Sequence, residues 1–451
     1  MDYQEAWQFL DDLQFFKMKL GLDSMNSFLE RLDQPQKKLK FVHIAGTNGK
    51  GSTAAHLFSI LTEAGFKVGL YSSPHLSSVR ERFRINEHFI SETDFARFAG
   101  EIITILEDKQ ITYFEFTTTL ALLWFAAENV DLVLMEVGMG GRLDATNVIK
   151  PYVTVITNVS MDHELYLGNS LTEVATEKAG IIKAGIPVVS GAERDDSLVV
   201  IEKKAQEEQV PLYLLGRDFF VQNEGGRSWR YSGIQQGVQY DKLVSGLYGS
   251  HQLDNAALAL AVLELLTPYG FDLSEDEIRA GLKKTCWPGR LEYFVLHRTT
   301  KRVIRRGTLP VQKSAKQDPD GVRFLLDGAH NPAGVRSLKN FLQELPGAYK
   351  SLICIWASMA DKDIQNSLVP IAPLFDHILL TRPESERSAK PEDIKNLLPE
   401  SIQEKAVCFD SVPMALQEGI KIADPDDLIC VAGSLYLVGK ARHILLGELA
   451  A

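Results

Sequence analysis

Short apolar runs alternate with segments of helical periodicity along most of the chain. The first run ends in a glycine-rich turn, and a helix follows in which Ala54, Leu57, Phe58 and Leu61 share one face before Gly65 ends it. The predicted strands are 39–45, 67–71, 132–137 and 152–157, and the predicted helices after the first are 93–107 and 114–128. Continuous apolar strands between helices predict a mostly parallel sheet that is covered on both faces.

The pattern changes between residues 216 and 250, where pieces interrupted by Gly, Gln and Ser predict small antiparallel strands at the edge of the first domain. Helices are expected again at 253–266 and 274–284. The basic, poorly patterned stretch 296–321 is typical of a linker or surface loop, so we place a domain boundary there. Beyond it the predicted strands are 323–327, 352–357, 377–381 and 428–431, with a helix from Pro332 and a last one from Leu435. This predicts a second, Rossmann-like, doubly wound unit.

The charge balance narrows the possible partners. The 451 residues include 48 Lys and Arg and 59 Asp and Glu, a net charge of −11, so we expect no broad affinity for nucleic acid or for an anionic membrane. The first residues lack a secretory leader, and no stretch approaches a membrane span, which favours the cytoplasm. Four cysteines without CxxC spacing are expected to be buried thiols rather than a zinc site or disulfides.

A candidate phosphate loop lies between the first predicted strand and its helix. It consists of Gly46, Thr47, Asn48, Gly49, Lys50, Gly51 and Ser52. Backbone N–H groups at a helix N-terminus can surround a phosphate there, and Lys50 can add a positive charge. The loop departs from the strict P-loop pattern, because Ile44 replaces the first glycine and Gly51 follows the lysine. Read alone, it could also be a glycine-rich turn with an exposed lysine.

Candidate magnesium ligands follow neighbouring strands. Glu136 closes the run 132–135, and a glycine-rich loop with one cation and one anion comes after it. His163 follows the strand 152–157, on what should be the same carboxyl edge of the sheet. A lone histidine is usually unremarkable, but here it would share an edge with Lys50 and Glu136.

Nine segments, in order, resemble the folylpolyglutamate synthase/dihydrofolate synthase family of the Mur ligase superfamily. They are GTNGKGS, YSSPHL, EVGMGGRLDATN, SMDH, EKAGIIK, GSHQLDNAALA, WPGRLE, DGAHNP and AGSLY. The resemblance implies an N-terminal P-loop-type ATPase and folate domain over 1–295 and a C-terminal glutamate-ligase domain over 296–451. It implies a ligase in which ATP phosphorylates a folate or pteroate carboxylate, and L-glutamate displaces phosphate from the acyl phosphate.

The resemblance also implies roles for single residues. Gly49, Lys50, Gly51 and Ser52 would contact the ATP phosphates, together with Asn255 and with Arg290, which would reach across the domain junction, and Asp327 would contact the ribose. The metal ligands would be Ser73, Glu136, His163 and Lys178, the last as a carbamate. His330 and Ser434 would lie near the incoming glutamate. Read alone, Lys178 would be an ordinary solvated helix lysine and Asn255 a polar helix residue. The implied cofactors are ATP and Mg²⁺, with K⁺ as a further cation, and the implied form is a monomer.

The substrate range depends on three stretches that the resemblance assigns to the pterin site. They supply Leu20, Tyr113, Phe114, Glu115, Arg142, Leu143 and Asp144. Phe114 could pack on the ring, and Glu115 or Asp144 could accept its N–H groups. We expect both dihydrofolate synthase and folylpolyglutamate synthase activity, although Lys19 stands where bifunctional members can carry an acidic residue. The alternatives are folylpolyglutamate synthase activity alone, a Mur-type ligase acting on a cell-wall precursor, and a nucleotide-operated binding module. A cell-wall ligase would normally carry an additional N-terminal domain, and the 45 residues before the loop leave no room for one.

Overall fold

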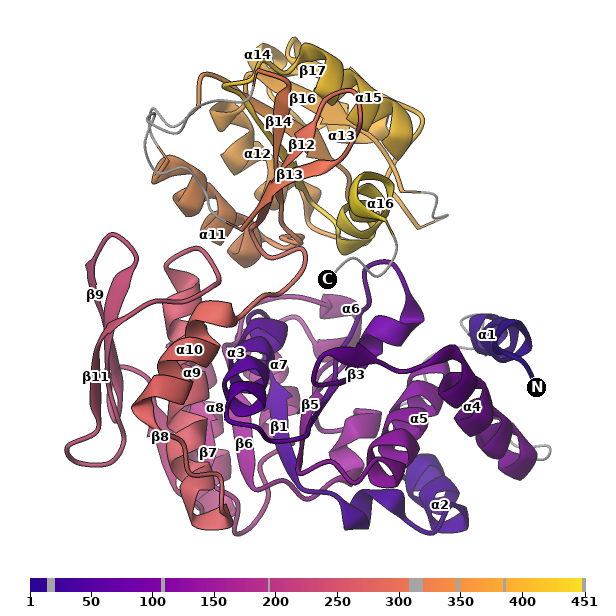
Figure 1. The fold of residues 1–451 in the computed structure, drawn as a ribbon, viewed down its shortest axis with the longest axis vertical. Helices are drawn as coiled ribbons and strands as arrows, with labels where there is room; N and C mark the ends of the chain where they lie inside the picture. Colours follow the sequence, from indigo (N-terminus) through magenta and orange to yellow (C-terminus); the bar gives the residue numbers. More distant parts are fainter. Residues whose placement is uncertain are drawn as a thin grey trace. The chain divides into compact units, whose positions relative to one another are not determined.

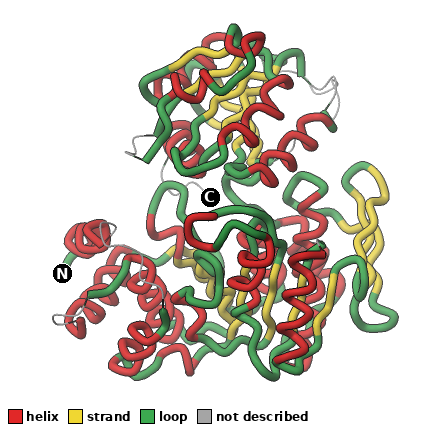
Figure 2. Tube along the Cα trace, turned by 180° about the vertical axis from the view of Figure 1, so that it is seen from behind, coloured by secondary structure: helices red, strands yellow, loops and turns green. Residues whose placement is uncertain are grey.

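The computed structural model describes residues 1–13, 21–106, 110–193, 195–307, 319–345, 349–383 and 387–447. Two compact units make up the chain, and both combine helices and strands (Figures 1 and 2). Unit 1 comprises Met1–His75, Val79–Gly246 and Gln252–Cys286, and unit 2 comprises Leu76–Ser78, Leu247–His251 and Trp287–Ala451. The WPGR segment therefore belongs to unit 2.

The central sheet of unit 1 has eight strands in the order β4-β3-β2-β5-β1-β6-β7-β8. Its strands are β1 (Phe41–Ala45), β2 (Val68–Tyr71), β3 (Phe83–Ile85), β4 (His88–Phe89), β5 (Leu132–Glu136), β6 (Val153–Ile156), β7 (Val188–Ser190) and β8 (Leu212–Leu214). The pairings from β2 to β8 are parallel, and only β3 and β4 add antiparallel strands at one edge. The predicted parallel sheet is confirmed, and β1 lies between β5 and β6.

Ten α-helices lie in the described part of unit 1, and only the first residue of α9, His251, belongs to unit 2 (Figure 1). They are α1 (Tyr3–Asp12), α2 (Asp23–Arg31), α3 (Lys50–Glu63), α4 (Glu92–Leu106), α5 (Tyr113–Ala127), α6 (Glu164–Leu167), α7 (Leu171–Ala179), α8 (Asp195–Glu207), α9 (His251–Leu266) and α10 (Glu275–Lys284). Helix α5 begins with a capping box, in which Thr112 Oγ1 accepts from Glu115 N and Glu115 Oε2 accepts from Thr112 N. This box fixes the start of a helix that is largely buried.

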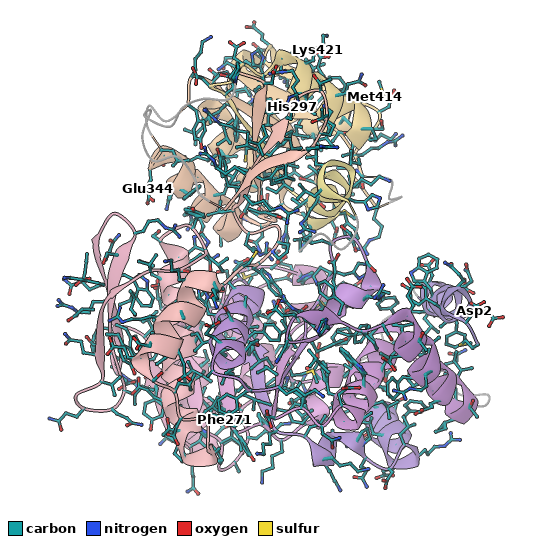
Figure 3. All side chains as sticks on the ribbon, viewed as in Figure 1. Asp2, Phe271, His297, Glu344, Met414 and Lys421 are labelled. Atoms are coloured by element: carbon teal, nitrogen blue, oxygen red, sulfur yellow. The ribbon has the colours of Figure 1, made fainter. Side chains whose placement is uncertain are left out.

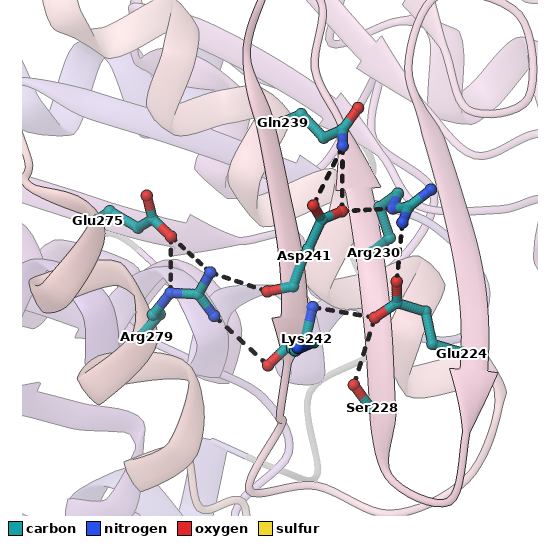
Figure 4. Close-up of polar contacts among 8 residues, drawn as sticks. All are labelled: Glu224, Ser228, Arg230, Gln239, Asp241, Lys242, Glu275 and Arg279. Atoms are coloured by element: carbon teal, nitrogen blue, oxygen red, sulfur yellow. Dashed lines mark hydrogen bonds and ion pairs between the residues drawn. The ribbon is translucent and has the colours of Figure 1, made fainter.

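A separate three-stranded antiparallel sheet accounts for the changed pattern after residue 216. It consists of β9 (Phe220–Gly225), β10 (Ser228–Ser232) and β11 (Gln239–Leu243). Polar contacts tie it together (Figure 4): Arg230 pairs with Asp241 and, at 3.1 Å, with Glu224, while Arg279 of α10 donates to Asp241 O at 2.8 Å. The predicted antiparallel strands are confirmed, and these charges anchor them to α10.

The sheet of unit 2 has seven strands in the order β13-β12-β14-β18-β15-β16-β17. They are β12 (Glu292–His297), β13 (Val303–Arg306), β14 (Gly321–Leu326), β15 (Leu352–Trp356), β16 (His377–Leu380), β17 (Ala406–Cys408) and β18 (Leu428–Ala432). Its α-helices are α11 (Pro332–Gln343), α12 (Ile364–Ile371), α13 (Pro391–Asn396), α14 (Glu400–Gln403), α15 (Val412–Ile422) and α16 (Leu435–Leu446). In Figure 3, Met414 and Lys421 mark the outer side of α15.

Two sequence expectations were wrong, one for the start of unit 2 and one for the cysteines. The stretch expected to be a linker contains β13, which pairs antiparallel with β12, and β12 pairs antiparallel with β14. Strand β13 escaped the pattern because it is an exposed edge strand with no buried face. Not every cysteine is buried either: Cys354 and Cys430 are, on neighbouring strands, but Cys286 is exposed.

Among the described residues no helix combines the length and apolar character needed to cross a bilayer.

Helix α10 packs closely on α3 through Gly281, and this contact gives a stability prediction. An added Cβ at Gly281 would lie 2.4 Å from Ile60 Cα, whereas one at Gly100 in α4 would meet nothing within 4 Å. Gly281→Ala should therefore lower the free energy of unfolding by about 1–3 kcal/mol, because the two helix backbones must separate. Gly100→Ala, the matched control, should raise it by up to about 1 kcal/mol. Urea unfolding of both variants tests this, and equal stability would contradict the close contact.

Candidate active site

The loop between β1 and α3 is held by the loop that follows β6. Asn158 O accepts from Thr47 N at 3.0 Å, and Asn158 Oδ1 accepts from Asn48 N at 2.9 Å. Thr157 Oγ1 donates to Asn48 O at 2.6 Å. Since β1 and β6 are parallel neighbours, their carboxyl ends meet at the same sheet edge, and the two loops brace each other there.

Two glycines let other groups approach this loop closely. At Gly46 an added Cβ would lie 1.9 Å from Thr157 Oγ1. Gly49 has φ 83° and precedes α3, and a Cβ there would lie 2.3 Å from Asn255 Oδ1 of α9. Asn255 is buried and donates from Nδ2 to Gln252 Oε1 at 3.0 Å. The predicted nucleotide-contacting asparagine therefore lies directly against the loop.

Lys50 begins α3 and folds back over the loop. Its Nζ donates to Gly46 O at 2.9 Å and to Thr47 O at 3.3 Å. The buried Ser52 lies in the first turn of the same helix. A helix N-terminus, a loop with left-handed glycine and a lysine ammonium together make a site suited to a phosphate anion.

Glu136 and Ser73 meet at the ends of neighbouring strands. Glu136 closes β5, Ser73 follows β2, and Ser73 N donates to Glu136 Oε2 at 3.1 Å. Glu136 is buried, with 4% of its surface exposed. The Ser73–Pro74 peptide bond is cis. These hard oxygen donors suit Mg²⁺ chemically.

The segment after β6 carries an acidic residue to which the sequence assigned no role. His163 has φ 53°, directly precedes α6 and leaves 40% of its side chain exposed, with Nε2 4.0 Å from Asp162 Oδ2. Asp162 also interacts electrostatically with Lys178. The position of Asp162 in the SMDH segment is the sequence signal that could have marked it as a site residue.

Lys178 lies near the C-terminal end of α7 and is 3% exposed. Burial, and next the charge of Lys50, lower its pKa to about 7, while Asp162 and Asp144 act in the opposite direction. Lys178 is thus a buried amine in the electrostatic neighbourhood of the phosphate loop, not a solvated helix lysine. A neutral amine can be converted to an anionic carbamate.

A metal ion at this site would depend on two ligands of less common type, a serine and a carbamylated lysine. The described residues contain no group of three or more His, Cys, Asp or Glu side chains arranged to hold a metal. The set expected from the sequence instead combines two such side chains, Glu136 and His163, with Ser73 and a carbamylated Lys178. Ser73 and Glu136 are in contact, so this part of the set fits a divalent cation.

A cavity of about 390 Å³, a size typical of small-molecule sites, lies beside the start of α5. Gly21, Met25, Phe28, Ile111 and Glu115 are among the residues that line it. Glu115 is 3% exposed, and its Oε1 has no hydrogen-bond partner in the described part of the chain. Gly21 comes from the first of the three stretches assigned to a pterin site, which also contains Leu20, and Glu115 comes from the second, so the cavity brings these two stretches together. Leu20 itself lies outside the described residues.

The aromatic residues beside Glu115 make other contacts. Tyr113 lies under the Arg82 guanidinium, whose Cζ is 5.3 Å from the ring centroid. Phe114 packs against Gly138, where an added Cβ would lie 2.4 Å from Phe114 Cζ. Phe114 therefore borders the glycine-rich loop after β5 instead of lining the cavity.

The charged residues of the third stretch, 142–144, form ion pairs and hydrogen bonds with other residues of unit 1. Arg142 pairs with Glu177 at 2.7 Å, and Leu143 is half-buried. Asp144 is buried: its Oδ2 accepts from Met139 N at 2.9 Å, and its Oδ1 accepts from the backbone and hydroxyl of Thr146. Burial raises the pKa of Asp144, and these hydrogen bonds limit the rise.

In unit 2, Arg290 and Asp327 belong to one cluster. Asp327 accepts from Leu291 N and from Ala329 N, both at 2.9 Å, and a Cβ at Gly328 would lie 2.4 Å from Arg290 Nη1. The half-buried His251, which the sequence did not single out, interacts electrostatically with both Asp327 and Arg290. Burial lowers the pKa of His251.

The two residues expected near glutamate also have local structural partners. His330 Nδ1 is 2.8 Å from Gly328 O, so its imidazole lies over the turn after β14. Ser434 is 1% exposed and caps α16 by accepting from Tyr436 N at 3.2 Å. A contact with glutamate at these positions stays a prediction.

Known proteins resemble the chain in both units. Two family profiles match it: the Mur ligase middle domain over residues 44–263, and the Mur ligase, glutamate ligase domain over residues 312–435. The chain is 32% identical to the dihydrofolate synthase/folylpolyglutamate synthase of Bacillus subtilis, over 98% of this chain and 99% of that one. It spans only 50% of a Haloferax volcanii relative, also 32% identical, described as a probable bifunctional folylpolyglutamate synthase/dihydropteroate synthase.

Solved structures agree with these relatives. An Escherichia coli FolC structure in complex with DHPP and ADP has a TM-score of 0.84 and 30% identity, and covers 99% of this chain and 98% of that one. A bifunctional folylpolyglutamate synthase/dihydrofolate synthase with Mn, AMPPNP and L-glutamate bound has a TM-score of 0.82 and 31% identity, with the same coverage. Given this similarity along nearly its whole length, the chain belongs to the folylpolyglutamate synthase/dihydrofolate synthase family of Mur ligases.

Proposed function

We propose that the protein is an ATP-dependent ligase that joins L-glutamate to the carboxylate of a folate or of dihydropteroate. The observation that carries this proposal is the braced phosphate loop, with Lys50 folded over it and the buried Lys178 in its electrostatic neighbourhood. Membership of the family supplies the reaction class.

The chemistry explains why such a site is needed. A carboxylate is a poor electrophile, since its leaving group would be oxide, whereas phosphate leaves readily. Transfer of the terminal phosphoryl group of ATP to the substrate carboxylate forms an acyl phosphate and ADP. The glutamate amine then attacks the acyl carbon, and the amide forms as phosphate leaves. The N-terminus of α3 and the Lys50 ammonium neutralise the negative charge that gathers in the first step.

Ser73, Glu136, His163 and a carbamylated Lys178 are the residues we propose as ligands of Mg²⁺. When bound, the ion would neutralise phosphate charge. Arg290 and Asp327 are the candidates in unit 2 for contacts with ATP, and His330 and Ser434 for contacts with glutamate. We further propose a cytoplasmic location, K⁺ as an additional cation and a monomer as the working form, and the last two points rest on the family resemblance alone.

We propose both family activities, with the cavity beside α5 as part of the pteridine site. Its lining combines apolar side chains such as Met25, Phe28 and Ile111 with polar ones. Glu115 offers a carboxylate oxygen that could accept N–H groups of the ring. Folylpolyglutamate synthase activity alone is the second candidate, because Lys19 stands where bifunctional members can carry an acidic residue.

The function is tested by incorporation of labelled glutamate in the presence of ATP and Mg²⁺, with dihydropteroate or tetrahydrofolate as acceptor. We expect incorporation with both acceptors, and ADP formation that depends on the acceptor. Lys50→Ala should abolish ADP formation while the protein stays folded, as circular dichroism would report. Incorporation with tetrahydrofolate alone would remove the dihydrofolate synthase half of the proposal, and ATP hydrolysis that never depends on glutamate would contradict a ligase.

The nucleotide site is tested by a matched pair of glycines. Gly49 and Gly65 have nearly the same backbone conformation, φ 83° and 86°, but only Gly49 lies against Asn255. Alanine at either position should cost about 1 kcal/mol of stability from backbone strain. Only Gly49→Ala should also weaken ADP binding measured by calorimetry, because the loop and α9 must move apart. Unchanged ADP affinity in this variant would speak against a nucleotide site at the loop.

The carbamate proposal predicts a dependence on carbon dioxide and pH. Only the neutral amine reacts with CO₂, and because the pKa of Lys178 is lowered to about 7, its neutral fraction rises from about pH 6 to pH 8. We expect activity to fall in CO₂-depleted buffer, to return when bicarbonate is added, and to depend on bicarbonate more steeply at the lower pH. Lys178→Ala should be inactive and insensitive to bicarbonate. Wild-type activity that ignores bicarbonate, with no carbamate signal from ¹³C-bicarbonate in NMR, would refute it.

A further inference from the structure

A fully buried histidine lies on β1, the strand that leads into the phosphate loop. His43 has 0% of its surface exposed, and its neighbours on β5 and β6 are Met135 and Thr154. Burial and then the charge of Lys183 lower its pKa well below the usual value, so the ring is neutral. A buried polar ring in a parallel sheet is costly unless it is hydrogen-bonded, and the roles assigned so far make no use of His43.

Its hydrogen bond leads to Asp144 through one hydroxyl. His43 Nε2 lies 2.9 Å from Thr146 Oγ1, and Thr146 Oγ1 lies 2.5 Å from Asp144 Oδ1. Thr146 is also fully buried. The other oxygen of Asp144 accepts from Met139 N, in the glycine-rich loop after β5. The chain His43–Thr146–Asp144 thus links β1 to the stretch assigned to the folate substrate.

The direction of each hydrogen bond follows from the number of protons. Both oxygens of Asp144 accept from N–H groups, as an ionised carboxylate does, so the single hydroxyl proton of Thr146 goes to Asp144. His43 Nε2 must then donate to Thr146 Oγ1. Nδ1 carries no proton in this tautomer, which agrees with its having no partner in the described part of the chain. Each donor in the chain has one acceptor.

We propose that His43 is a positioning residue which, through the Thr146 hydroxyl, fixes the carboxylate of Asp144 for contact with the pteridine-bearing substrate. This inference rests on the proposed function and on the expectation, implied by the family resemblance, that Asp144 contacts the substrate. The neutral Nε2–H tautomer leaves Thr146 only one way to donate, toward Asp144. The Thr146 hydroxyl bond also favours the ionised form of Asp144, which burial disfavours.

The test compares kcat and KM for tetrahydrofolate and for ATP across a pH series. Thr146→Val and His43→Leu remove the chain, Thr146→Ser keeps the hydroxyl, and His43→Gln keeps an amide donor. Thr154→Val is the matched control, since Thr154 lies opposite His43 in β6 and its hydroxyl bonds Ile181 O instead. Asp144→Asn reports whether the carboxylate matters at all.

For Thr146→Val and His43→Leu we expect the KM for tetrahydrofolate to rise about tenfold, the loss of roughly one hydrogen bond to a charged group. The KM for ATP should stay unchanged. In Thr146→Val the acidic limb of kcat/KM should move to higher pH, because Asp144 loses the hydroxyl donor and its pKa rises. In His43→Leu the shift should be smaller, because Thr146 keeps its hydroxyl but is no longer oriented by the imidazole. Thr146→Ser, His43→Gln and Thr154→Val should behave like the wild type.

Equal changes in both KM values, or an unmoved acidic limb, would overturn the inference and leave His43 a packing residue. If His43→Leu fails to fold, the Thr146→Val and Thr146→Ser pair decides. A tetrahydrofolate KM that Asp144→Asn leaves unchanged would refute the substrate role of Asp144 and the inference with it. A wild type without glutamate ligation would instead refute the proposed function.

Discussion

The hydrogen bonds between the loop after β1 and the loop after β6 are the constraint on which the candidate site depends. Asn158 holds two successive backbone N–H groups, of Thr47 and Asn48, and Thr157 holds the carbonyl of Asn48. With these groups fixed, the chain can turn into α3 through a left-handed glycine. The start of α3, and with it the ammonium of Lys50, is therefore set by the neighbouring strand and not only by the loop itself.

The same sheet edge gathers the remaining chemistry of unit 1. Glu136 and Ser73 arrive on β5 and after β2, while Asp162 and His163 arrive after β6, because parallel strands all end on one side. Lys178 comes from a helix and is buried, and the charge of Lys50 in the loop helps to lower its pKa. Placing an amine in such surroundings costs stability, which is consistent with a role beyond packing.

Much of this arrangement could be read from the sequence, for reasons that particular segments make clear. Strand β5 is apolar at all but its last position, so both the strand and the significance of Glu136 stand out. The lowered pKa of Lys178 could not be read, because it depends on burial that only the fold reveals. Asp162 lies in the SMDH segment, but the sequence alone predicts no role for it. Strand β13 was missed because a basic edge strand lacks the alternation that marks a half-buried one. The partners of Asp144 depend on a turn whose hydrogen bonds no pattern of residue types specifies.

The exposed strand β13 has a consequence for how separate molecules behave at high concentration. In the described part of the chain it pairs only with β12, which leaves a row of backbone groups available at the sheet edge. Lys301, Arg302, Arg305 and Arg306 surround that row and are all exposed. A second molecule that approached with the same edge would meet like charge, so intermolecular strand addition and fibre growth are disfavoured there. A stretch that looks like a linker thus also protects solubility.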